Sequence, residues 1–254
     1  MKPAVKNILL RSSMLLILVA VAALMICAKI NRERTTVSAI DVKIDDMNDQ
    51  FFVSKESVKT LVTTHFNCMG KTMSGTILRK IENRVESMPQ IRDASAYMDD
   101  KGVLTIQVEQ RMPVARVFSK SGESFYIDES GYKFPLSNSF SAKVPIITGN
   151  ITESGQQVEK ISTPNLKNAF EVEKQLKKDK TWSAMIGQIN VNEKNELELV
   201  PRLGNAIVLL GAPENLELKM KKLGVFYTEV IGKQGWDKYK VINIMYKDQV
   251  VCLK

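Results

Sequence analysis

The chain has 254 residues, of which 44% are hydrophobic and 25% are charged, with 36 Lys and Arg against 28 Asp and Glu. This length allows one or two domains, and this composition excludes a wholly disordered chain. The formal net charge of +8 suits a polyanionic partner such as a nucleic acid, a membrane surface or an acidic protein, so the positions of the charges decide among these classes.

A long apolar stretch lies near the N-terminus. Residues 14–28 contain no charged side chain, and the segment 12–30 is long enough to cross a bilayer as a helix. We expect 12–30 to be an uncleaved transmembrane signal anchor that follows a cytoplasmic tail, residues 1–11. The apolar core does not end in a small-x-small cleavage site, which argues against a cleaved signal peptide. Bulky Ile26 in front of Cys27 argues against a lipoprotein.

The flanks of this anchor hold most of the excess charge. Residues 1–34 contain six basic residues and one acidic residue, a net charge of +5, which leaves +3 for residues 35–254. Both flanks carry three basic side chains, and the α-amino group makes the tail slightly more positive, which predicts a cytoplasmic tail and an exported body. The body itself lacks the strong charge signature of a nucleic-acid-binding protein, so we expect no nucleic-acid partner.

The first part of the body alternates between strand and helix patterns. Residues 37–44 predict a strand. Ser54 and Ser74 are each expected to be the N-cap of a helix, because apolar residues follow them at helical spacing. Two further strands, 91–98 and 103–108, are joined by a short polar turn. The predicted order is therefore β-α-α-β-β.

The second part of the body is richer in strands. We expect one helix at 165–178 and another that begins at Pro213. Lys219, Lys221 and Lys222 are expected on the solvent-facing side of the second helix, with binding of an acidic partner as the alternative. The predicted strands are 114–118, 125–127, 132–134, 186–191, 197–200, 206–210, 241–245 and 250–253.

The sequence offers few candidates for catalysis or metal binding. His65 is the only histidine, so no multi-histidine metal site can form, and we expect it at a helix end. There is no G-x-S-x-G elbow, no P-loop and no dinucleotide-binding motif. We expect Cys68 and Cys252 to be free thiols, with a disulfide between them as the alternative. We therefore predict no catalytic residues, no metal and no cofactor.

These features together resemble the bacterial cell-division family FtsQ, which is called DivIB in Gram-positive bacteria. The resemblance rests on the order of the elements behind one anchor and on four short stretches, which are 52–54, 108–115, 125–135 and 145–149. The Gly-Asn pair usual after the first strand is absent, and residues 45–49 stand in its place. The resemblance implies an α+β fold with an N-terminal transmembrane helix, a POTRA domain (β-α-α-β-β) at 36–111 and a mostly antiparallel β domain with flanking helices at 112–254.

The resemblance also implies a function and a binding site. It implies a non-enzymatic divisome scaffold in the inner membrane at the septum, which binds FtsB- and FtsL-like proteins and septal peptidoglycan synthase proteins and helps to regulate septal peptidoglycan synthesis. In the family, the last strand of the β domain receives a strand of FtsB, as an exposed sheet edge allows. The alternative is that Tyr246 and Val250 only pack within the fold. The matching residues here are Met245, Tyr246, Lys247, Asp248, Gln249, Val250 and Val251.

Two other functions stay open at this point. A membrane-anchored periplasmic enzyme acting on the cell wall fits the expected location and the spare carboxylates, among them the pairs Asp45-Asp46 and Asp99-Asp100. A POTRA-bearing chaperone for outer-membrane proteins fits the first domain, but the sequence contains no tandem POTRA copies.

Overall fold

The computed structural model describes residues 14, 16–23, 25, 35–45 and 52–254. The expected tail, 1–11, lies outside the described residues, as does much of the expected anchor, 12–30; the described residues of the anchor are helical. Within the described part of the chain, no helix combines the length and the apolar character that crossing a bilayer requires.

The rest of the described chain forms two compact units, each of which is considered by itself. The first unit holds 35–45 and 53–110, and the second holds Phe52 and 111–254. The first unit confirms the predicted β-α-α-β-β order. Its elements are β1 (Ala39–Ile44), α2 (Lys55–Phe66), α3 (Gly75–Glu86), β2 (Ile91–Met98) and β3 (Val103–Gln110).

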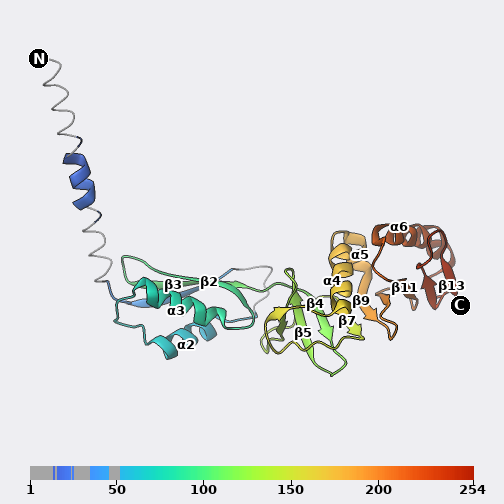
Figure 1. Cartoon of the computed structure of the whole chain (residues 1–254), viewed down its shortest axis with the longest axis horizontal. Helices are drawn as coiled ribbons and strands as arrows, with labels where there is room; N and C mark the ends of the chain where they lie inside the picture. The colour runs from blue at the N-terminus through green and yellow to red at the C-terminus, as the bar shows by residue number, and fades with distance from the viewer. Residues whose placement is uncertain (1–13, 15, 24, 26–34, 46–51) are drawn as a thin grey trace, which may run out of the picture. The chain divides into compact units, whose positions relative to one another are not determined.

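The three strands of the first unit form one sheet with the order β1-β3-β2, in which β1 runs parallel and β2 antiparallel to β3. The helices α2 and α3 lie side by side along it (Figure 1). Apolar residues at helical spacing on the helices meet alternate residues of the strands, which gives the unit one core. Its fully buried members include Val58, Val62, Ile81, Val85, Leu104, Ile106 and Val108.

Both helices of the first unit begin at the predicted N-caps. The hydroxyl of Ser54 accepts a hydrogen bond from the backbone N–H of Ser57 at 3.1 Å, and that of Ser74 accepts one from Ile77 at 3.4 Å. These bonds satisfy N–H groups that have no partner within the helix. Asn67 ends α2 in a left-handed conformation with φ of 43°, which an asparagine tolerates better than most residues. Capping groups next to these helix ends therefore coincide with the observed boundaries.

The second unit contains a mixed sheet with the order β13-β12-β11-β10-β9-β7-β4-β5-β6-β8. Together with the first unit it makes the described chain an α+β protein, as predicted. Its strands are β4 (Pro113–Phe118), β5 (Ser124–Asp128), β6 (Tyr132–Pro135), β7 (Ile146–Gly149), β8 (Glu159–Lys160), β9 (Ile186–Val191), β10 (Leu197–Pro201), β11 (Ile207–Gly211), β12 (Val241–Asn243) and β13 (Val251–Leu253).

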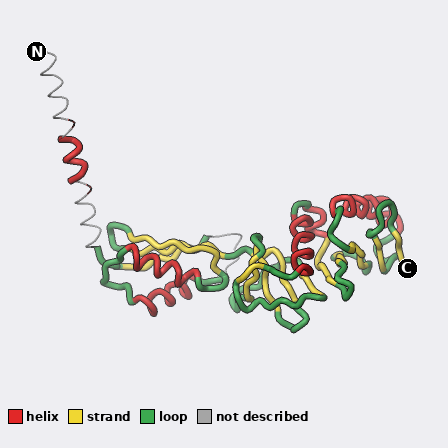
Figure 2. The backbone as a smooth tube through the Cα atoms, viewed as in Figure 1, coloured by secondary structure: helices red, strands yellow, loops and turns green. Residues whose placement is uncertain are grey.

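The helices of the second unit pack on one side of this sheet (Figure 2). They are α4 (Pro164–Lys177), α5 (Lys180–Met185), α6 (Leu216–Phe226), the π-helix η1 (Tyr227–Ile231) and the short α7 (Gly232–Gln234). The helix predicted to begin at Pro213 instead begins at Leu216, because Asn215 is left-handed with φ of 53° and cannot belong to a right-handed helix.

One row of directly paired residues forms part of the core along the second sheet. The row runs from β5 to β13, and each member is directly opposite the next in the register. Because side chains alternate along a strand, all members of the row point to the face that the helices cover. The members are Phe125, Val117, Ile147, Ile189, Leu199, Val208 and Ile242, which are fully buried, and Cys252, which is half-buried.

Candidate functional site

The C-terminal hairpin contains the residues predicted to bind a partner strand. β12 ends at Asn243 and β13 begins at Val251, so Val251 alone of the predicted set lies in a strand. Met245 to Val250 belong to the loop that joins the two strands. The expectation that 245–251 is itself the last strand is therefore corrected: the last strand is β13, three residues long. The role of these residues in partner binding stays a prediction.

Two side chains explain why the strand ends early. The Oδ1 atom of Asn243 accepts a hydrogen bond from the N–H of Met245 at 2.9 Å, which turns the backbone just after β12. The ammonium of Lys222, on α6, donates to the carbonyl of Ile244 at 3.0 Å and also to the carbonyl of Tyr246. Carbonyls held by a lysine are diverted from a strand ladder, so the loop replaces the expected extension of β12.

A pocket of about 250 Å³ lies between this loop and the start of α6. It combines apolar and aromatic side chains with ammonium groups. Leu218, Met245 and Tyr246 supply exposed apolar surface, and 51% of Tyr246 is exposed. The lining residues are Asn215, Leu218, Lys219, Lys222, Met245, Tyr246 and Lys247.

The two half-buried lysines of this pocket are held by main-chain carbonyls. Lys219 donates to the carbonyls of Leu210 at 3.0 Å and Ala212 at 2.7 Å. Burial lowers the pKa of Lys219, and it also lowers the pKa of Lys222, where the carboxylate of Asp248 partly opposes the effect. The expectation of a solvent-facing cluster therefore holds for exposed Lys221 but not for Lys219 or Lys222. Their helical spacing of three residues is the sequence signal for this shared face.

β13 ends the ten-stranded sheet of the described chain, with β12 as its neighbour on the other side. Its outer edge therefore presents backbone N–H and C=O groups. Val251 is 39% exposed and Leu253 is 60% exposed, whereas Cys252 between them packs against the core, where burial raises the pKa of its thiol. The strand thus has one anchored face and one open edge.

The face of the sheet opposite the helices is apolar near this edge. Ile207, Val241 and Leu253 are directly paired across β11, β12 and β13, so their side chains share that face. Leu209, Asn243 and Val251 form the next row of directly paired residues. An incoming strand beside β13 would extend both rows.

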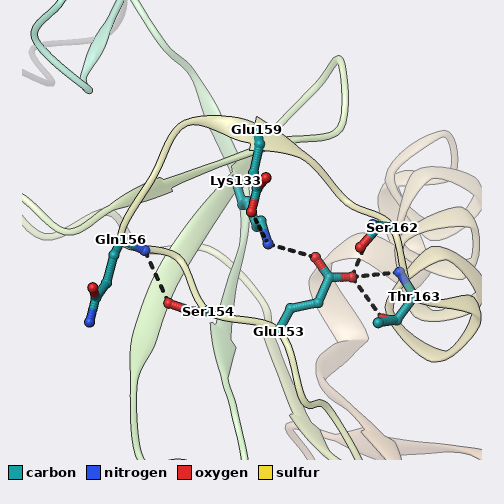
Figure 3. Close-up of polar contacts among 7 residues, drawn as sticks. All are labelled: Lys133, Glu153, Ser154, Gln156, Glu159, Ser162 and Thr163. Atoms are coloured by element: carbon teal, nitrogen blue, oxygen red, sulfur yellow. Dashed lines mark hydrogen bonds and ion pairs between the residues drawn. The ribbon is translucent and has the colours of Figure 1, made fainter.

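A buried ionic cluster lies elsewhere in the second unit, near the start of α4. The ammonium of Lys133, on β6, lies 2.9 Å from Oε2 of Glu153 and 2.8 Å from Oε1 of Glu159 (Figure 3). Oε1 of Glu153 accepts hydrogen bonds from the N–H groups of Ser162 and Thr163 and from the Thr163 hydroxyl. Glu153 thereby supplies the side-chain cap that Thr163, the N-cap residue, does not provide itself. The cluster joins a strand to a helix end, which is a structural role.

His65 and Cys68, two side chains with chemically reactive groups, lie in structural surroundings. Nδ1 of His65 lies 2.9 Å from the carbonyl of Leu61, and its Nε2 lies 2.8 Å from the guanidinium of Arg84. Cys68 is a buried free thiol whose pKa is raised by burial. Among the described residues, no group of three or more His, Cys, Asp or Glu side chains is placed to hold a metal ion.

Both units of the chain match known protein families. Residues 112–253 match the family model described as FtsQ/DivIB, C-terminal related, and residues 35–109 match a POTRA-like domain. The chain is also similar to the cell division protein FtsQ of Salinibacter ruber (strain DSM 13855 / M31), with 24% identity over 188 residues, which is 72% of this chain and 71% of that relative. The larger of the two domain matches covers more than half of the chain.

Proposed function

The chain belongs to the FtsQ/DivIB family, and from this membership we propose that it acts in cell division as a non-enzymatic scaffold of the divisome. In this proposal, 36–111 is the POTRA domain and 112–254 is the β domain that binds FtsB- and FtsL-like partners. Segment 12–30 anchors the chain in the inner membrane, and the body lies in the periplasm at the septum. Its binding partners connect it to the control of septal peptidoglycan synthesis.

The open edge of β13 is the observation that supports the partner-binding part of this proposal. An extended partner segment can pair with β13 through main-chain hydrogen bonds, which supply affinity whatever the partner sequence. Selectivity then comes from side chains beside the edge. Exposed Val251 and Leu253 would contact alternate residues of the added strand.

The loop that precedes β13 would supply the second part of the interface. Tyr246 and Met245 lie over the pocket beside α6, so a side chain that follows the partner strand would be buried against them. Partly exposed aromatic residues in such positions contribute much of the binding energy of protein interfaces. The ammonium groups of Lys219, Lys222 and Lys247 favour a partner with a carboxylate nearby.

Replacing Tyr246 with glutamate is expected to weaken capture of the FtsB-like partner by about tenfold or more. The change removes aromatic contact area and places a carboxylate where the docked partner would exclude water. The measurement is co-purification of that partner with the tagged full chain, followed by titration of the purified pair. Tyr97→Glu is the matched control, because Tyr97 is 43% exposed and lies on β2 of the first unit. Equal capture by the two variants would remove the site assignment.

The scaffold role itself predicts where the protein collects in the cell. A fluorescent fusion of the full chain is expected to concentrate at the septum of dividing cells, because its proposed partners assemble there. A fusion that stays evenly distributed around the cell, while the chain remains intact on a blot, would contradict the proposal.

A further inference from the structure

The outer edge of β2 in the first unit is occupied in an unusual way. β2 is eight residues long and is an edge strand, because β3 is its only neighbour in the three-stranded sheet of the described chain. An edge strand of this length exposes alternate N–H and C=O groups that invite another strand. Here two of those N–H groups already have acceptors, and the acceptors come from a helix.

The acceptors are two glutamates of α3. Oε1 of Glu82 accepts a hydrogen bond from the N–H of Ala96 at 2.9 Å, and Oε1 of Glu86 accepts one from the N–H of Ala94 at 3.4 Å. Alternate residues of an edge strand turn their N–H groups to the same side. Since both N–H groups point to the carboxylates, they are the ones directed away from β3.

The distance between the two glutamates along α3 is close to the distance between the two alanines along β2, so both hydrogen bonds can form together. Residues four apart on a helix are separated by about 6 Å along its axis. Residues two apart on an antiparallel strand are separated by about 6.8 Å. The higher-numbered glutamate meets the lower-numbered alanine, so α3 and β2 run in opposite directions. Ile81 and Val85, each one residue before a glutamate, are fully buried and fix α3 on the core.

We infer that Glu82 and Glu86 close the β2 edge to strand addition, and that the strand they exclude is β2 of a second copy of this chain. A two-fold axis at Ser95 would place Ala94 opposite Ala96 of the second copy, where the two residues exchange N–H···O=C bonds. The same axis places Asp93 opposite Tyr97, so no like charges face each other. The edge is therefore self-complementary once the carboxylates are removed.

The inference predicts self-association when both acceptors are lost. The full chain carrying Glu82→Ala and Glu86→Ala is expected to dimerise about tenfold more tightly than the native chain, or more, in sedimentation velocity under the same detergent and salt. The matched control is Glu82→Gln with Glu86→Gln, which removes the same charge but keeps an amide oxygen as acceptor. The control is expected to sediment as the native chain does. Native-like behaviour of the alanine variant, or equal dimerisation of the glutamine variant, would overturn the inference.

Amide exchange of the single variants tests the contacts one by one and does not depend on dimerisation. Glu82→Ala is expected to speed hydrogen exchange at the Ala96 amide by about tenfold and to leave Ala94 unchanged. Glu86→Ala is expected to do the reverse. A general loosening of the unit would accelerate both amides together in either variant, and that result would count against a specific closing role.

Discussion

At pH 8, the Glu173→Gln variant is expected to be more stable to unfolding than the native chain by about 3 kcal/mol. Glu173 lies on α4 with 3% of its surface exposed. Burial raises the pKa of its carboxyl to about 7, and the charges of Lys177 and Arg202 offset only part of that effect. The native fold therefore has to bury a carboxylate at pH 8, whereas glutamine stays neutral.

The sign of the pH dependence follows from the two states of Glu173. Its pKa has the ordinary value of 4.5 in the unfolded chain and about 7 in the folded chain. Between these pH values the folded chain holds a proton that the unfolded chain has released, so this carboxyl makes the native chain less stable as the pH rises. The advantage of the glutamine variant should be small at pH 4 and complete above pH 7.

Urea titrations at pH 4 and pH 8, followed by tryptophan fluorescence, measure this difference. Both tryptophans, Trp182 and Trp236, belong to the second unit, so the signal reports that unit alone. Glu171→Gln is the control, because Glu171 lies two residues away on the same helix with 65% of its side chain exposed. A Glu173→Gln advantage that is the same at both pH values would show that folding does not raise the pKa of this carboxyl.

The second large effect is expected at Glu153. Glu153→Ala should destabilise the second unit by about 3–5 kcal/mol, because it leaves the ammonium of Lys133 with one exposed partner and removes the cap of α4. The side chains of Lys133 and Glu153 are 5% and 3% exposed. Burial by itself would raise the pKa of Glu153, but hydrogen bonds from Thr163 and Ser162 and the contact with Lys133 lower it overall.

Glu159→Ala is the matched control, because it removes the other carboxylate from the same lysine. Glu159 is 58% exposed, so its loss should cost less than about 1 kcal/mol. The same urea titrations compare the two variants at neutral pH. Equal losses from both would mean that burial is not what makes the Glu153 contact strong.

The pH range of the Lys133–Glu153 contact is also predictable. The pKa of Glu153 lies below its ordinary 4.5, so its contribution is present above that value and is lost as the pH falls through the lower, folded-state pKa. Burial would lower the pKa of Lys133, but the bonds to Glu159 and Glu153 raise it above 10.5. The stabilisation that Lys133 contributes to the fold is present below pH 10.5 and is lost as the pH rises through the higher, folded-state pKa. The destabilisation by Glu153→Ala should therefore shrink in strong acid.

Features that depend on neighbouring residues could be predicted from the sequence. Ser54 and Ser74 precede apolar residues at helical spacing, and each caps a helix where expected. The alternation in 103–108 predicted β3, which extends to Gln110. In each case the signal lies within one element and its cap.

Features that depend on contacts between distant residues could not be predicted in this way. The end of β12 depends on Lys222, which lies more than twenty residues earlier in the chain and binds the carbonyl of Ile244. Glu173 has the sequence position of an ordinary charged residue on an amphipathic helix, and only the packing around α4 reveals that it is buried. The sequence pattern therefore predicts strands near β12 and β13, but the partner-binding edge strand expected at 245–251 is mostly loop.

The two ends of the ten-stranded sheet differ in a way that limits assembly. β8 has two residues, both charged, and Glu159 is already engaged with Lys133. Short, charged edges resist the addition of another strand. β13 carries exposed Val251 and Leu253 instead. Each copy of this unit therefore offers one sheet edge, that of β13, where strand addition is not opposed by charged edge residues.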